Sequence, residues 1–170
     1  MPPKFQNAIE RFDAANAKDP DGEALVYAQR MSEWLEKLAP DASEALKLAA
    51  RSQHIRRWEI PRNRYPMNRA GYHRWRNELA EFHAKVAGQI LSEVGYDQAT
   101  VGRVQSLLKK ERLKEDPEAQ LLEDVICLVF LQHYFEEFAK EHDEEKVIGI
   151  LRKTWRKMSE RGHEAALQLP

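Results

Sequence analysis

The sequence predicts an all-α fold, a single helical domain that spans residues 1–170. Apolar side chains recur at helical spacing through most of the chain, and no stretch of four or more residues alternates as a strand does. The 7 glycines and 8 prolines fall mainly at the ends of these periodic segments. We therefore expect a bundle of six or seven helices. In chain order they cover about residues 3–17, 22–38, 42–55, 69–94, 97–111, 116–141 and 143–160.

Turn signals separate the first three helices. The run Asp19-Pro20-Asp21-Gly22 is typical of a turn, because proline and glycine interrupt a helical pattern. Pro40 ends the second helix. Asp41 and Glu44 stand three residues apart, the spacing of a capping box, so we expect Asp41 to cap the third helix.

An irregular segment, the Arg-rich loop (residues 56–68), follows the third helix. Pro61 and Pro66 lie five residues apart and exclude a helix there. The next helix is long and ends at Val94, where Gly95 is a typical C-cap residue.

The second half of the chain contains the most apolar helix. Asp97 caps one helix, and Asp116-Pro117-Glu118 is a typical start for the next. Between Leu121 and Leu131 the side chains are apolar almost all round, which predicts a central, buried helix. Cys127 lies in this run and reads as a small core residue, and a single cysteine excludes a disulfide framework.

Composition excludes several classes of protein. With 42% apolar and 32% charged residues, the chain is neither collagen-like nor disordered. No run approaches 18 consecutive apolar residues, and residues 1–6 lack the hydrophobic region of a signal peptide. We therefore expect a cytoplasmic protein with no membrane partner.

Charge is distributed unevenly, although the net charge is only −1. Residues 51–76 hold eight arginines, no lysine and one acid, whereas residues 111–145 hold twelve acids and three basic residues. Arginine grips phosphate or carboxylate with two parallel hydrogen bonds, and lysine does not replace it in that role. We expect an anionic ligand here, with docking on the acidic half of the fold as the alternative. The expected substrate-binding residues of this segment are Arg51, Arg57, Arg62, Arg64, Arg69, Arg76 and Tyr72.

Three titratable side chains stand on apolar helix faces. Asp124 interrupts the buried helix, where a carboxylate must be paired, hydrogen-bonded or metal-bound. His83 lies on the apolar stripe of its helix, and His54 ends the apolar face of the third helix. Either each is a satisfied core residue, or the three surround one cavity as acid–base or metal-binding groups. Their spacing alone is no metal signature.

The order of four segments resembles the HD superfamily of metal-dependent phosphohydrolases over about residues 20–141. These segments are Leu25–Met31, Leu48–Ile55, His83–Leu91 and Asp116–Asp124. The resemblance implies a helical bundle that binds a divalent metal (Mn, Co, Ni, Mg or Zn), with His54, His83 and Asp124 as the matching ligands. The chain departs from the superfamily where Tyr27 replaces the first histidine and Ile55 the aspartate after His54. Lys109 begins the run that replaces a later histidine pair, and joins the expected substrate-binding residues.

Two further runs are similar to an uncharacterised family, domain of unknown function 4202. They are Ala49–Trp58 and Leu122–Leu131, and the similarity extends over nearly the whole chain. It implies the helical fold and brings no established activity.

Three functions are left open by the sequence. The first is an HD-like phosphohydrolase that acts on a small phosphorylated, nucleotide-like substrate. The second is an inactive HD-like protein that binds such a ligand without turnover, and the third is an RNA-binding module built on the Arg-rich loop. The net charge of −1 makes nucleic acid the least favoured partner. The substrate and the oligomeric state are not predicted.

Overall fold

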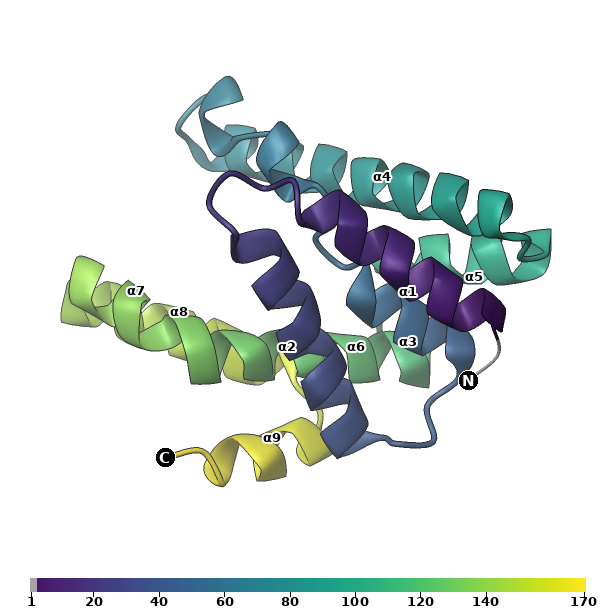
Figure 1. Ribbon diagram of the computed structural model, residues 1–170. Helices are drawn as coiled ribbons and strands as arrows, with labels where there is room; N and C mark the ends of the chain where they lie inside the picture. The colour runs from purple at the N-terminus through teal and green to yellow at the C-terminus, as the bar shows by residue number, and fades with distance from the viewer. Residues whose placement is uncertain (1–2) are drawn as a thin grey trace.

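The structure, a computed structural model, describes residues 3–170, and helices make up most of this range (Figure 1). The α-helices are α1 (Pro3–Asn16), α2 (Glu23–Leu38), α3 (Glu44–Arg51), α4 (Arg69–Val94), α5 (Gln98–Leu108), α6 (Pro117–Val129), α7 (Phe135–Glu141), α8 (Glu144–Lys157) and α9 (Glu160–Leu167). Two 3₁₀ turns, η1 (Arg57–Glu59) and η2 (Arg62–Arg64), lie in the Arg-rich loop, and a π-helical turn, η3 (Phe130–Tyr134), joins α6 to α7. No strand occurs in the described range, so the all-α prediction is confirmed.

Helix α6 lies at the centre of the bundle and contacts α2, α3, α5, α8 and α9. Its residues Leu122, Val125, Leu128 and Val129 are at most 2% exposed, which confirms the predicted central helix. On one side α4 runs alongside α1 and α5, and α2 crosses in front of α6 (Figure 1). Within residues 3–170, no helix is long and apolar enough to cross a membrane.

Most of the predicted caps are present, but one was placed wrongly. Asp97 accepts a hydrogen bond from the Thr100 amide at 2.8 Å, and Gly95 ends α4 with a φ of 110°. The predicted Asp41 cap is wrong, because α3 begins two residues later than expected. Ser43 caps it instead, accepting from the Leu46 amide at 3.1 Å.

Two predicted helices end early, the predicted helix over residues 116–141 is divided into α6, η3 and α7, and one helix was not predicted. Helix α3 ends at Arg51 rather than residue 55, and α5 ends at Leu108 rather than residue 111. The chain becomes extended at Met158, and Ser159 caps α9, a helix that the sequence did not predict. Residues 3–170 therefore hold nine α-helices, more than the six or seven expected.

The Arg-rich loop folds tightly onto the start of α4. Asn68 accepts from the Gly71 amide at 2.7 Å, and Trp75 Nε1 donates to the Ile60 carbonyl at 2.8 Å. A Cβ atom on Gly71 would lie 2.0 Å from the Pro66 carbonyl oxygen. Only glycine allows this approach of two backbones, so Gly71 determines where the loop sits.

We expect Gly71→Ala to destabilise the protein by about 2 kcal/mol, because the backbone at Pro66 must move to admit the methyl group. Gly102→Ala in α5 is the matched control, since a Cβ there meets no atom within 4 Å. Higher helix propensity should make that variant about 0.5–1 kcal/mol more stable. Urea unfolding measures both free energies, and equal behaviour of the two variants would contradict the close approach.

Candidate functional site

Four aromatic side chains from separate elements meet between α2, α4 and α6, and we call them the histidine cluster: Tyr27, His54, His83 and Tyr134. Tyr27 of α2 stacks on His54, with ring centroids 4.2 Å apart and planes within 10°. His83 of α4 lies 5.8 Å from His54 between centroids, and Tyr134 of η3 lies 6.1 Å from Tyr27. The structure therefore brings together the two histidines that the sequence singled out.

His83 is held in one tautomer by the backbone. Its Nδ1 lies 2.8 Å from the Ile55 carbonyl oxygen, which can only accept, so Nδ1 carries the proton. Nε2 is then left with its lone pair, and it is buried without a hydrogen-bond partner in the described part of the chain. The side chain is only 4% exposed, so this free acceptor lies inside the protein.

His54 is positioned by the turn after α3 rather than by the helix that the sequence predicted. Ser52 Oγ donates to the Leu48 carbonyl at 2.8 Å where α3 ends. Arg56 then takes a left-handed conformation with a φ of 55°, and its amide donates to Asn16 Oδ1 at 3.0 Å. This turn places the His54 ring against the Tyr27 ring. Arg57, the first residue of η1, follows the turn and acts electrostatically on both histidines.

Two arginines lie close to the histidine cluster and have no acidic partner. Across residues 3–170 no carboxylate forms an ion pair with Arg57 or Arg76. The Arg57 guanidinium lies over the Trp75 ring at 5.1 Å, and Arg76 donates to the Tyr72 hydroxyl at 3.2 Å. Burial lowers the pKa of Arg57, and the nearby Arg76 adds to that effect. The two like charges therefore repel each other.

Burial and these cations keep both histidines neutral. Burial is the largest cause that lowers the pKa of His83, and Arg57 and Arg76 lower it further, to about 4. The same causes, with His83 itself, hold the pKa of His54 well below its ordinary value. Burial raises the pKa of the Tyr27 hydroxyl, which therefore stays protonated. The site combines neutral aromatic groups with positive charge.

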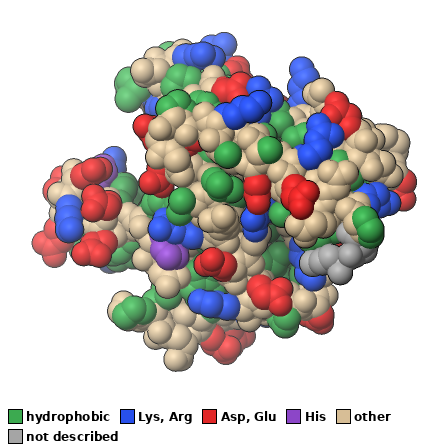
Figure 2. Space-filling view, in the orientation of Figure 1, with side chains coloured by type: hydrophobic (Ala, Val, Ile, Leu, Met, Phe, Trp, Pro, Cys, Tyr) green, Lys and Arg blue, Asp and Glu red, His purple; other side chains and the backbone are tan. Residues whose placement is uncertain are grey.

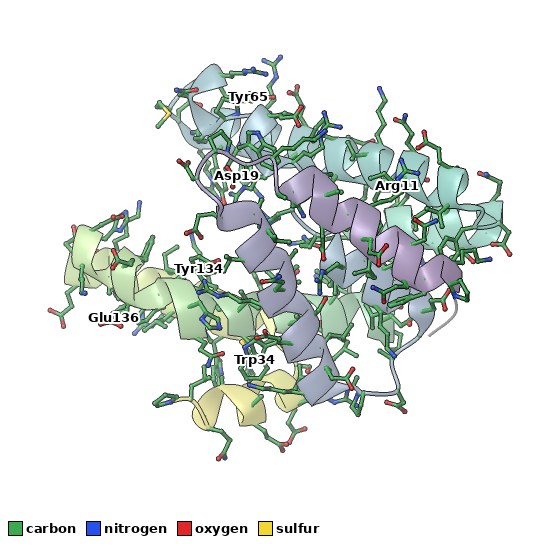
Figure 3. The ribbon with its side chains drawn as sticks, in the orientation of Figure 1. Arg11, Asp19, Trp34, Tyr65, Tyr134 and Glu136 are labelled. Atoms are coloured by element: carbon green, nitrogen blue, oxygen red, sulfur yellow. The ribbon has the colours of Figure 1, made fainter. Side chains whose placement is uncertain are left out.

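Residues that the sequence did not single out complete the surroundings. Lys110 Nζ lies 3.1 Å from Glu123 Oε2, and both side chains act electrostatically on the cluster. Two residues of α2 hold the π turn, since Arg30 donates to the Tyr134 hydroxyl at 3.1 Å and Trp34 Nε1 donates to Gln132 at 2.7 Å. Figure 3 labels Trp34 and Tyr134 where α2 meets this turn.

Asp124 serves a different junction, that between α6 and α9. Its carboxylate accepts from the Ser159 amide at 2.8 Å, from the Ser159 hydroxyl and from Gln120 Nε2 at 3.1 Å. A Cβ on Gly162 would lie 2.8 Å from the Asp124 carboxyl carbon, so α9 covers the acid closely. The neighbouring Glu123 pairs with Lys110 and acts electrostatically on Tyr27 of the histidine cluster. Neither carboxylate forms the ion pair with an arginine that the sequence offered as one alternative.

Of the three expected metal ligands, His54 and His83 lie in the histidine cluster, whereas Asp124 binds the start of α9. Residues 3–170 contain no group of three or more His, Cys, Asp or Glu side chains that could hold a metal. Arg57, Arg76 and Lys110 would also repel a divalent cation. The metal that the resemblance implies stays a prediction.

The other predicted ligand-binding residues have different neighbours. Arg51 makes two hydrogen bonds to Asp13, at 2.9 and 2.8 Å. Arg62 donates to the Pro66 carbonyl at 3.0 Å and so braces its own loop. Arg56 pairs with Glu59 and Arg74 with Glu78, whereas Arg64 and Arg69 are exposed. Lys109 pairs with Glu111 at 3.6 Å. In the described range, no arginine of residues 51–76 forms an ion pair with residues 111–145, the alternative considered above.

The neutral His83 makes stability depend on pH. Between pH 6.5 and about 4 the unfolded chain binds a proton at this histidine that the folded protein does not bind, so stability falls as the pH falls. His83→Asn keeps a donor for the Ile55 carbonyl and removes this titration. We expect the natural chain to lose about 2 kcal/mol more than the variant between pH 6.5 and 4.5.

Urea unfolding at the two pH values measures this difference, because carboxylates titrate alike in both proteins and cancel. His73→Asn, which changes an exposed histidine of the same helix, is the matched control and should behave as the natural chain does. A natural chain with the pH dependence of His83→Asn would show that His83 is not held neutral.

Comparison with known proteins identifies the family. The family model described as "Domain of unknown function (DUF4202)" matches residues 6–170, which is nearly the whole chain. No curated protein and no solved structure matches the chain. The match agrees with the similarity seen in Ala49–Trp58 and Leu122–Leu131. The chain belongs to the domain of unknown function 4202 family.

Proposed function

We propose that this protein binds a small phosphorylated molecule at the histidine cluster, with the phosphate between Arg57 and Arg76. One observation supports this most directly: two arginines that form no ion pair within residues 3–170 act electrostatically on the buried His83 and the half-buried His54, both of which are neutral. Like charges repel each other, and an anion between the half-buried Arg57 and the exposed Arg76 would attract both and offset that repulsion. Residues 51–76 contain arginine and no lysine. This favours a ligand that offers two oxygen atoms to one guanidinium group, as phosphate does.

The surroundings suit a phosphate monoester. A dianion beside His83 would oppose the effect of the two arginines and raise the pKa of the imidazole towards its ordinary value. His83 Nε2, which has no partner in the described range, would then donate a hydrogen bond to a phosphate oxygen. The Tyr27 and Tyr134 rings offer apolar surface for the rest of the ligand.

A compact ligand fits these residues better than RNA does. Binding along a nucleic acid backbone needs several free cations spread over a surface. Three arginines of the segment, Arg51, Arg56 and Arg74, are already paired with acids, and Arg62 is used within its loop.

Hydrolysis of the phosphate ester is the second candidate, and the geometry of His83 favours it. In this alternative His83 stays neutral and its Nε2 does not donate to the phosphate. A base that is oriented through Nδ1 and presents an unprotonated Nε2 is the arrangement of general-base catalysis. In the proposed reaction Nε2 takes a proton from water as the water oxygen attacks phosphorus and the P–O bond to the alcohol breaks. The leaving alcohol takes up a proton from solvent.

Calorimetric titration with inorganic phosphate and with simple phosphate monoesters tests the binding proposal. We expect Arg57→Gln and Arg76→Gln each to weaken binding about tenfold or more, because each removes a charge-assisted hydrogen bond. Arg74→Gln is the matched control on α4, since Arg74 pairs with Glu78 at 3.3 Å, and it should bind as the natural chain does. No binding at millimolar concentration, or an equal effect of all three variants, would refute the site.

Release of phosphate from the monoesters tests hydrolysis separately. His83→Asn should lower the rate at least a hundredfold, the usual contribution of a general base, while the dissociation constant changes only a few-fold. If the natural chain binds these monoesters and releases no phosphate, the hydrolysis proposal is refuted and the binding proposal stands.

A further inference from the structure

Helix α8 carries a stripe of exposed apolar side chains. Ile148, Leu151 and Trp155 are 40%, 37% and 41% exposed, and they stand three and seven residues along the helix from Ile148. At this spacing they share one face of the helix. Single exposed hydrophobic residues are ordinary, whereas a contiguous stripe indicates an interaction surface.

The apolar arc of α8 is wider than the part that the bundle covers. The helix turns Val147, Ile150 and Thr154 towards the protein, and only Thr154 is fully buried. Each residue of the exposed stripe follows an inner residue by one position, so at 100° per residue the stripe is centred about 100° around the helix from that inner face. The sequence of α8 thus provides apolar surface for two neighbours, and in residues 3–170 the stripe remains exposed.

Trp155 is held in a defined orientation. Its indole stacks on the His163 ring of α9, with centroids 3.7 Å apart and planes within 4°. His163 Nε2 also lies 2.8 Å from the Trp155 carbonyl oxygen, which requires a proton on Nε2. A side chain that is already ordered loses little conformational entropy when a partner covers it.

Charges at the two ends of α8 indicate which partner fits. The first turn carries Glu144 and Glu145, and the last turn carries Arg156 and Lys157. An antiparallel neighbour of the same sequence would set each acidic end beside a basic end. Figure 1 shows α7 and α8 projecting from the bundle, so a second molecule can approach them. Figure 2 shows acidic side chains gathered on this projection.

We infer that two copies of this chain pair through α8, antiparallel, about a two-fold axis near Leu151. This arrangement sets Ile148 opposite Trp155 of the second copy and Glu144 within one turn of Arg156 of the second copy. The stripe is self-complementary, as the interface of a two-fold dimer must be. A helix of 14 residues is about 21 Å long, so the interface is small and the dimer is in exchange with monomer.

Sedimentation equilibrium of the full chain between about 1 and 500 µM tests the inference, since small interfaces give dissociation constants on the order of 1–100 µM. We expect the mass to rise from monomer to dimer across this range. Leu151→Lys should remove the dimer, because it places two like charges at the axis. A monomer at every concentration overturns the inference, and so does a dimer that survives Leu151→Lys.

A charge exchange tests the antiparallel arrangement. Glu144→Arg and Arg156→Glu should each weaken the dimer about tenfold, and the double variant should restore it. Each substitution also replaces a charge that is favourable at its end of the helix. Lys153→Glu, on the side of α8 away from the stripe, is the matched control and should not change the dissociation constant. Circular dichroism of every variant checks that α8 remains helical. Failure of the double variant to recover overturns the arrangement.

Discussion

The burial of α6 on every side is the constraint on which the rest of the structure depends. Two adjacent acids interrupt this helix, and neither reaches solvent, since Glu123 is 3% and Asp124 1% exposed. An unpaired carboxylate in such a place would cost several kcal/mol, so each must find its own neighbour. Asp124 holds the first turn of α9 through Ser159, and Glu123 holds the end of α5 through Lys110. The contacts of these two buried carboxylates thus determine where α9 and the end of α5 lie against the core.

The elements that the sequence predicted well are those with local signals. Gly95 marks the end of α4, and Asp116-Pro117 marks the start of α6, and these bounds agree with the structure within a residue or two. The predicted helix over residues 116–141 is instead interrupted after Val129 by the π turn η3. No such signal marks the end of α3 at Arg51, and the turn that follows is held by the contact of the left-handed Arg56, through its amide, with Asn16 of α1. Nor does one mark α9, since Ser159 becomes a cap only because Asp124 binds it from another helix. These boundaries depend on tertiary contacts, which periodicity does not contain.

The candidate site divides in the same way. His54 and His83 could be picked out because each interrupts an apolar helix face, and they lie together as expected. Asp124 and Glu123 are neighbours about 100° apart on one helix, so the pattern could not decide which faced the histidines. Tyr134 depends on the extra residue of a π turn, which shifts the face that follows it. The pairing of Arg51 with Asp13 joins residues 38 positions apart, so arginine density alone could not separate structural from free arginines.

Several locally unfavourable features occur between Arg56 and His83. Others lie elsewhere, such as the left-handed Lys110 and Arg112 and the buried Tyr96 hydroxyl, which has no partner in the described range. Arg56 is left-handed, His83 Nε2 is buried without a partner in the described range, and Arg57 and Arg76 repel each other. Each lowers the stability of the ligand-free protein, and each is held in place by backbone contacts such as that of His83 with Ile55. A fold that only needed stability would gain from an acid beside the arginines, as Asp13 stands beside Arg51. In the proposed function, an anion would supply the charge and the hydrogen-bond partner that the protein leaves out at this place.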